Sequence, residues 1–129
     1  MSLPRSSIVV FRVCLAITLV VIMYLATTPK SYAAVESLND KANHLLAFGA
    51  LALLGDFSFP AEKFGIKKFL WLLSYGLLIE FVQYFLPYRA ASVLDLIADC
   101  MGLAIYWMFY GHLKHLPMLR LRWLELSQE

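Results

Sequence analysis

The chain has 129 residues, of which 61% are hydrophobic and 16% are charged, and its formal net charge at pH 7 is +2. Soluble domains carry about 45–50% apolar and about 25% charged residues, so this composition excludes an ordinary soluble domain and is typical of membrane proteins. The length suits one compact unit, and we therefore expect a single domain over residues 1–129.

The sequence lacks the motifs that mark common catalytic and nucleic-acid-binding folds. It contains no glycine-rich phosphate loop, no Ser-His-Asp signature and no basic patch with interleaved aromatic residues. Cys14 and Cys100 lie in apolar runs without paired or metal-ligand spacing, so we interpret them as small packing residues. We therefore expect no cofactor and no nucleic-acid partner.

Four apolar segments follow one another along the chain and predict helices over residues 8–26, 42–59, 69–86 and 92–111. A helix of about 20 residues, rising about 1.5 Å per residue, crosses the hydrocarbon core of a bilayer. The fold class that this pattern predicts is all-α: a polytopic membrane protein built as a four-transmembrane-helix bundle, with the lipid bilayer as a partner.

The first segment has two interpretations. As a retained helix, residues 8–26 are interrupted only by Arg12, whose aliphatic stem can carry its charge to the lipid headgroups. As a cleaved signal peptide, Arg5 and Arg12 would form the basic region, and residues 31–33 would form a small-x-small cleavage site. Lys30 beside that site argues against cleavage, so we favour the retained helix.

The other three segments each carry a stripe of residues spaced by three and four, which is polar at one end and small at the other. Such stripes are typical of helix faces that pack against neighbouring helices in a membrane. Asp40, at the start of the second segment, complements the positive end of the helix dipole. The stripes comprise Lys41, His44, Phe48, Ala52 and Gly55; Gly76, Glu80, Gln83 and Tyr84; and Ser92, Asp95, Asp99, Gly102 and Tyr106.

The distribution of basic residues predicts the orientation of the four helices. The first and third loops with their flanks hold only Lys30, Lys41 and Arg89. The N-terminus, the second loop and the C-terminal tail hold Arg5, Arg12, Lys63, Lys67, Lys68, Lys114, Arg120 and Arg122. The positive-inside rule therefore places both termini in the cytoplasm. The tail over residues 112–129 suits an interfacial segment on an anionic leaflet or a solvated terminus.

This orientation brings polar residues of three helices to one depth. Glu80 is seven residues before Pro87, and Asp99 is seven residues after Ser92, so both would lie about 10 Å below the outer interface. His44, Gln83 and Asp95 would lie just above them. Ionisable groups inside a membrane usually face the bundle interior, pair with one another and mark a site. We therefore predict a polar pocket near the outer face.

The motifs in residues 40–102 resemble those of the VanZ-like family of small bacterial membrane proteins. They are D-K-x-x-H-x-x-x-F at Asp40, Lys41, His44 and Phe48, E-x-x-Q at Glu80 and Gln83, Arg89, S-x-x-D at Ser92 and Asp95, and Gly102. Asp99 departs from the family pattern, which more often has Asn there. The resemblance implies a polytopic protein of the bacterial inner membrane, associated in the founding member of the family with teicoplanin resistance.

The candidate site residues fall into two groups. His44, Glu80, Asp95 and Asp99 are candidates for acid/base chemistry, and Asp40, Lys41, Gln83, Arg89 and Ser92 are candidates for binding. We expect Arg89 to be the counter-ion of a buried carboxylate, and one of the two aspartates to keep its proton because two ionised groups would repel. A metal site on His44 and the three carboxylates is disfavoured, since the sequence has no paired-histidine spacing such as H-E-x-x-H.

Four functions remain open from the sequence, of which a proton- or ion-coupled carrier is disfavoured for a four-helix unit unless it oligomerises. We favour a binding or protective module whose outer-face pocket engages an amphipathic or lipid-linked envelope molecule, such as a lipoglycopeptide. An intramembrane hydrolase or transferase acting on a lipid headgroup through His44 or Glu80 is the alternative, although no activated nucleophile is evident. The polar residues could instead only hold the bundle together, since such contacts contribute about 0.6 kcal/mol each on average.

Single-cysteine labelling tests the predicted topology. With one engineered cysteine near Lys67 or near Arg89, we expect a membrane-impermeant thiol reagent to label the second position in intact cells and to leave the first unlabelled. The reason is that only the loop before the fourth helix would face outward. The opposite labelling pattern would reverse the orientation and place the polar layer at the cytoplasmic face.

Overall fold

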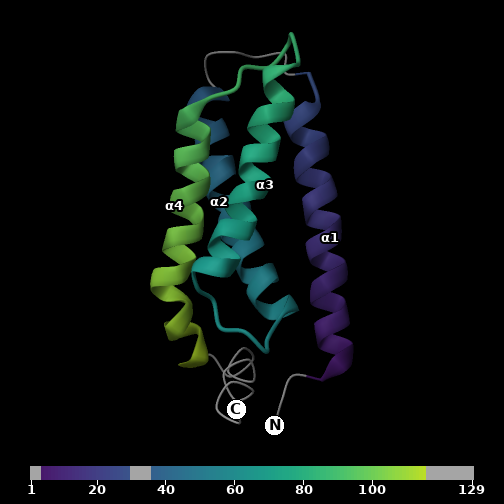
Figure 1. The fold of residues 1–129 in the computed structure, drawn as a ribbon, viewed down its shortest axis with the longest axis vertical. Coiled ribbons are helices and arrows are strands. Elements are labelled where there is room, and N and C mark those ends of the chain that lie inside the picture. Colours follow the sequence, from purple (N-terminus) through teal and green to yellow (C-terminus); the bar gives the residue numbers. More distant parts are fainter. Residues whose placement is uncertain (1–3, 30–35, 116–129) are drawn as a thin grey trace.

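A computed structural model describes residues 4–29 and 36–115 of the chain. The elements are α1 (Arg5–Thr27), α2 (Glu36–Ser58), α3 (Ile66–Tyr84), α4 (Val93–Phe109) and a short 3₁₀ helix, η1 (Tyr110–His115). Figure 1 shows the four α-helices side by side, with successive helices running in opposite directions along the long axis. The described residues contain no strand, so the all-α prediction is confirmed.

All four predicted helices are present, but their ends differ from those expected. The largest difference is at α2, which begins at Glu36, whereas the apolar pattern begins only after Lys41. Hydropathy marks the part of a helix that is buried or in lipid, while the backbone hydrogen bonds of a helix continue through polar residues. α1 ends at Thr27, because Thr28 adopts an extended conformation before Pro29.

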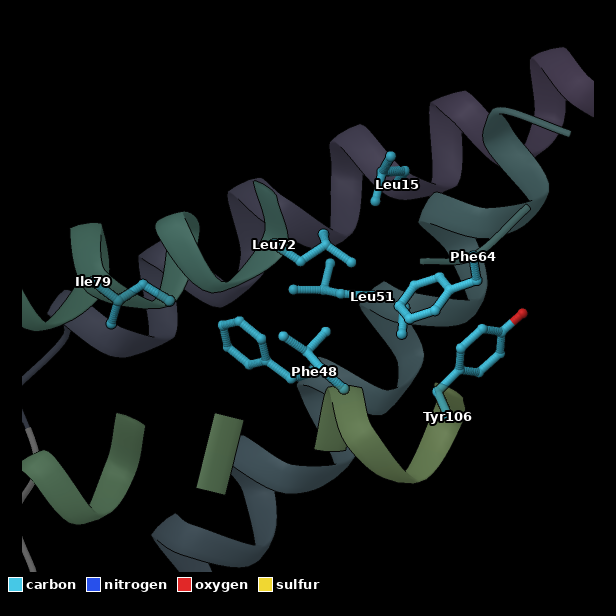
Figure 2. Packing of buried hydrophobic residues seen from close by; sticks show 9 residues of the cluster. Leu15, Phe48, Leu51, Phe64, Leu72, Ile79 and Tyr106 are labelled. Atoms are coloured by element: carbon cyan, nitrogen blue, oxygen red, sulfur yellow. The ribbon is translucent and has the colours of Figure 1, made fainter. Parts of the chain in front are cut away.

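The apolar core is built around α2, which contacts each of the other three α-helices and packs most extensively against α4. Phe48 and Leu51 on α2 are fully buried, together with Leu72 and Ile79 of α3 and Leu103 of α4. Figure 2 shows the labelled members of this cluster meeting between the helices. This packing fixes which face of each helix points inward.

Gly102 allows α4 to lie directly against α2. A Cβ atom at this position would overlap the carbonyl oxygen of Leu45 and would lie 3.0 Å from the backbone nitrogen of Gly49. Gly76 of α3 has a similar role, since a Cβ atom there would lie 2.7 Å from Oδ2 of Asp99 and 3.2 Å from the ring of Phe48. Small residues at these two crossings therefore set the spacing of α2, α3 and α4.

α1 packs against the bundle through the buried Leu15 and through the partly buried Leu19, Ile22, Met23 and Ala26, and polar contacts add to this packing. The hydroxyl of Tyr75 donates a hydrogen bond to the carbonyl of Leu19. Near the other end of α1, Arg12 donates from Nε to the carbonyl of Ser58 at 2.9 Å. These contacts make α1 a structural part of the bundle.

The surface of the described residues is unusually apolar, while charged side chains lie inside. The exposed fractions of Val20, Phe81 and Val93 are 69%, 63% and 75%, whereas Asp56 and Asp99 are fully buried. Two stretches, Arg5–Thr27 and Val93–Leu113, are long and apolar enough to cross a membrane. A signal sequence or a core helix of a soluble protein can be equally long and apolar. By the same measure, α2 and α3 are not apolar enough to cross a membrane. Four membrane spans therefore remain a prediction.

The crossing at Gly102 is testable by substitution. Gly102→Ala places a methyl group against the backbone of Leu45, so α2 and α4 must separate, and overpacking of this kind costs about 1–3 kcal/mol of folding free energy. We expect a lower midpoint of thermal unfolding in detergent for Gly102→Ala. The matched control is Gly111→Ala, where a Cβ atom would meet nothing within 4 Å, and equal midpoints in the two variants would contradict the close contact.

Candidate functional site

α2 and α4 both begin at the upper end of the bundle in Figure 1, and the first turns of these two helices carry most of the polar residues of the candidate site. Lys41 and His44 lie three residues apart on α2, and Asp95 and Asp99 lie four residues apart on α4, so each pair shares a helix face. Nζ of Lys41 is 3.4 Å from Oδ1 of Asp95. Nδ1 of His44 is 2.7 Å from Oδ1 of Asp99, and its Nε2 is 3.9 Å from Oδ2 of Asp95.

Glu80 joins this group from α3. Its Oε2 accepts a hydrogen bond of 2.7 Å from the backbone N–H of Ser92, the residue that precedes the first turn of α4. The Ser92 side chain makes no capping hydrogen bond, so the Glu80 carboxylate supplies an acceptor at this helix end. We name these six residues the His44 cluster: Lys41, His44, Glu80, Ser92, Asp95 and Asp99.

Gln83 and Arg89 bind the end of α1 instead of joining the carboxylates. Nε2 of Gln83 donates to the carbonyl of Ala26 at 2.9 Å. The Arg89 guanidinium donates to the carbonyls of Thr28 and Leu25, which belong to the C-terminal end of α1. The last carbonyls of a helix lack intrahelical partners and carry the negative end of its dipole, so a cation is favoured there.

This contact corrects the prediction that Arg89 is the counter-ion of a buried carboxylate. The ion pairs between described residues do not include Arg89, and the cation nearest to the carboxylates is Lys41 at 3.4 Å from Asp95. The sequence does not reveal that the C-terminal end of α1 lies beside the loop that carries Arg89, and this neighbour decides the pairing.

A cavity of about 480 Å³ lies beside the His44 cluster, between α1, α2 and α3. His44 lines it, so one wall of the cavity belongs to the cluster. Asn43, Gln83 and Arg89 add further polar groups to the lining, and the rest of the lining is mostly apolar. The full lining comprises Ile22, Leu25, Ala26, Thr28, Pro29, Asn43, His44, Ala47, Phe48, Ile79, Gln83 and Arg89. A site with a polar part and a longer apolar part suits an amphipathic ligand.

A second buried polar cluster, which the sequence pattern does not predict, lies at the opposite end of the bundle. Nζ of Lys68 lies 3.0 Å from Oδ1 of Asp56 and donates to the carbonyls of Phe59 and Glu62. The Tyr106 hydroxyl donates to Oδ2 of Asp56 at 2.7 Å. In the sequence, the signal for this cluster is Asp56, which interrupts an otherwise apolar segment. Its partner Lys68 is predicted to lie in the second loop, so the pattern does not place it inside the bundle.

This Lys68 cluster, comprising Asp56, Lys68 and Tyr106, is balanced in charge and rich in hydrogen bonds, unlike the His44 cluster. Its aspartate and lysine form an ion pair, and both carboxylate oxygens of Asp56 are used. A buried pair of this kind is costly to break but contributes little net stability when intact. We therefore assign it a structural role.

Some residues considered in the sequence analysis lie outside the described part of the chain. The backbone of Asp40 belongs to α2, but its side chain is not described. The proposed cleavage site at residues 31–33 and the tail from residue 116 onward also fall outside the described ranges.

Comparison with known proteins identifies a family. The family described as VanZ/LLP1 matches residues 15–114, which is well over half of the chain and includes both polar clusters. This match confirms the resemblance that the motifs in residues 40–102 indicated. No curated protein and no solved structure matches the chain.

The structural role of the Lys68 cluster predicts a contrast between two adjacent lysines. Lys68→Met removes the cation beside a fully buried Asp56, and leaving a buried charge unpaired costs about 3–5 kcal/mol. Lys67 is the matched control, because 86% of its side chain is exposed and its partner Glu62 is also at the surface. We expect Lys68→Met to lower the unfolding midpoint strongly in detergent, and Lys67→Met to leave it unchanged. Similar midpoints for both variants would contradict the assignment.

Proposed function

This chain belongs to the VanZ/LLP1 family, and on that basis we propose that it is a multi-pass protein of the bacterial inner membrane. We propose further that its cavity engages an amphipathic or lipid-linked molecule of the cell envelope. The polar part of that molecule would lie against the His44 cluster and Arg89, and its apolar part would lie along α1 and α3.

The distribution of polar and apolar side chains supports membrane insertion. Soluble monomers rarely expose contiguous apolar patches larger than a few hundred Å². Here α1 is apolar along its length and only 6% of its most apolar window is buried, while Asp56, Asp95 and Asp99 lie inside the bundle. Charged groups that face the bundle interior and pair there are the expected arrangement in lipid. The proposed orientation, with both termini in the cytoplasm, rests on the excess of basic residues in the sequence of the N-terminus, the second loop and the C-terminal tail.

The observation that carries the binding proposal is the composition of the cavity lining. Cavities that hold small ligands measure about 300–1,000 Å³ and combine apolar walls with a few polar groups. In this cavity Asn43, His44, Gln83 and Arg89 supply polar groups, and Arg89 adds a permanent positive charge. Ile22, Phe48 and Ile79 supply apolar wall. We therefore favour an occupant with an anionic or strongly polar headgroup and an apolar chain.

We also propose that occupancy of this cavity affects the susceptibility of the host to glycopeptides. The resemblance implies an association with teicoplanin resistance, and a lipoglycopeptide and a lipid-linked envelope precursor are both amphipathic. Either could use the same division of the lining into polar and apolar parts. The occupant is therefore an amphiphile. Analysis of the lipids bound to the purified protein distinguishes a lipoglycopeptide from a lipid-linked envelope precursor.

One observation favours a second candidate, a hydrolase or transferase that acts on a lipid headgroup. Nδ1 of His44 lies 2.7 Å from Oδ1 of Asp99, and a carboxylate in this position orients a histidine that acts as a general base. Ser92, three residues before Asp95 in the sequence, carries a hydroxyl group, but it belongs to no nucleophile motif. Binding is therefore the first choice and catalysis the second.

Filling the cavity tests the binding proposal. Ala47→Leu adds three carbon atoms at a position that lines the cavity, so we expect at least a tenfold loss of the amphiphile that co-purifies with the protein. Mass spectrometry of lipids extracted from protein purified in native membrane discs measures this loss. The same variant should change the glycopeptide susceptibility of the host while its abundance in the membrane stays near normal.

Ala50→Leu is the control on the same helix, because Ala50 is exposed and lies outside that cavity. It should keep the co-purifying molecule. Equal lipid content in wild type and both variants would contradict the binding proposal and leave a bundle held together by polar contacts. Release of a cleaved headgroup by the wild type but not by His44→Gln would favour the enzymatic alternative.

A further inference from the structure

Three helices bring metal-ligand atoms together in the His44 cluster. One donor atom each from His44, Glu80 and Asp95 lies within 4.8 Å of the other two. Zinc and similar ions bind histidine nitrogen and carboxylate oxygen at about 2.0–2.2 Å, and in the usual tetrahedral arrangement two such ligand atoms lie about 3.4 Å apart. The three donors, which lie within 4.8 Å of one another, would therefore have to close by up to about 1.4 Å around an ion. The sequence shows no such motif, because the donors come from α2, α3 and α4.

Asp99 orients His44 as an outer carboxylate does in metal sites. Histidine ligands usually donate their second ring N–H to a carboxylate, which fixes the tautomer and raises the basicity of the ligating nitrogen. Here Nδ1 of His44 lies 2.7 Å from Oδ1 of Asp99, and Nε2 lies on the side of Asp95, 3.9 Å from its Oδ2. Asp99 itself is fully buried and held by its place against Gly76.

The charges of the cluster favour a divalent cation. Glu80, Asp95 and Asp99 carry three carboxylates, and Lys41 is the cation that pairs with them among the described residues. With all three ionised and the histidine neutral, the cluster holds an excess of two negative charges. Buried charge without a counter-charge is strongly unfavourable, so the carboxylates must either take up protons or bind a cation. One divalent ion would balance the cluster.

Two buried acceptors supply an independent sign of a ligand. Oε1 of Glu80 is buried and has no hydrogen-bond partner among the described residues. Gln83, one helical turn further along α3, is only 3% exposed, and its Oε1 also lacks a partner there. Gln83 and His44 both line the cavity. Leaving a buried acceptor unsatisfied costs about 1–3 kcal/mol, so a bound ion with its water molecules would satisfy groups that the protein leaves open.

We propose that His44, Glu80 and Asp95 bind one divalent transition-metal ion, with Zn²⁺ preferred over Mn²⁺ and Mg²⁺. The imidazole ligand sets this preference, because Mg²⁺ is bound mainly through oxygen atoms and water. Three protein ligands leave a position for water or for an anionic group in the adjoining cavity. The proposal concerns the cluster alone and holds whether or not the cavity takes an amphiphile.

Metal binding to the purified protein tests this proposal directly. The untagged chain, with its exposed His112 and His115 replaced by glutamine, is stripped with a chelator in detergent and titrated with Zn²⁺ and with Mn²⁺. We expect one Zn²⁺ per chain by elemental analysis after dialysis, together with a raised unfolding midpoint. Binding should weaken as the pH is lowered, because the ligands must be deprotonated.

Substitutions locate the ion. Glu80→Gln and Asp95→Asn keep the shape of the side chains but remove ligand charge, and each should weaken Zn²⁺ binding about 100-fold or more. Asp99→Asn acts only through His44 and should cost about 10–100-fold. Glu62→Gln, an exposed position at the other end of the bundle, is the matched control and should bind Zn²⁺ as the parent does. Helix content and elution volume without metal show which variants are folded.

Spectroscopy of the unsubstituted chain keeps the test valid if a variant does not fold. X-ray absorption at the zinc edge should show one imidazole and oxygen ligands, with no sulfur from Cys14 or Cys100. The proposal fails if the wild-type chain binds no Zn²⁺, if the ligands include sulfur, or if folded Glu80→Gln and Asp95→Asn variants bind as tightly as the control. In each of these cases protons, and not a metal ion, balance the cluster.

Discussion

The contact between α2 and α4 at Gly102 is the constraint on which the candidate site depends. Because no side chain separates Gly102 from the backbone of Leu45, the two helices approach closely and their register is set. That register places Asp99 opposite His44 and Asp95 opposite Lys41. α3 then adds Glu80, and Gly76 makes room on α3 for the carboxylate of Asp99. The polar groups therefore meet as a consequence of backbone packing.

The two buried polar clusters differ in charge balance, in hydrogen bonding and in access to a cavity. In the Lys68 cluster one cation meets one carboxylate, and hydroxyl and carbonyl partners complete the hydrogen bonding. In the His44 cluster three carboxylates face one lysine, a buried oxygen of Glu80 has no partner among the described residues, and a cavity adjoins. The His44 cluster therefore has an excess of carboxylates that the Lys68 cluster lacks, and either protons or a bound cation must balance it.

α1 contributes to the site without supplying a candidate acid or base. Its carbonyl groups receive hydrogen bonds from Tyr75, Gln83 and Arg89, and its side chains form one wall of the cavity. Leu15, Leu19 and Ile22 also pack in or against the core, so polar and apolar contacts together attach α1 to the bundle. Retention of α1, as opposed to its removal as a signal peptide, stays a prediction.

The sequence by itself determined the helices and most members of the site, and the tertiary structure decided how they pair. Hydropathy located four helices, and the spacing of three and four put His44, Glu80, Asp95 and Asp99 on inward faces, because both patterns are properties of a single segment. Periodicity does not say which helix a face meets. Arg89 therefore caps α1 instead of pairing with a carboxylate, Lys68 reaches Asp56 inside the bundle, and metal-ligand atoms converge from three helices without a local motif. These outcomes depend on helix crossings at Gly76 and Gly102, which only the folded chain defines.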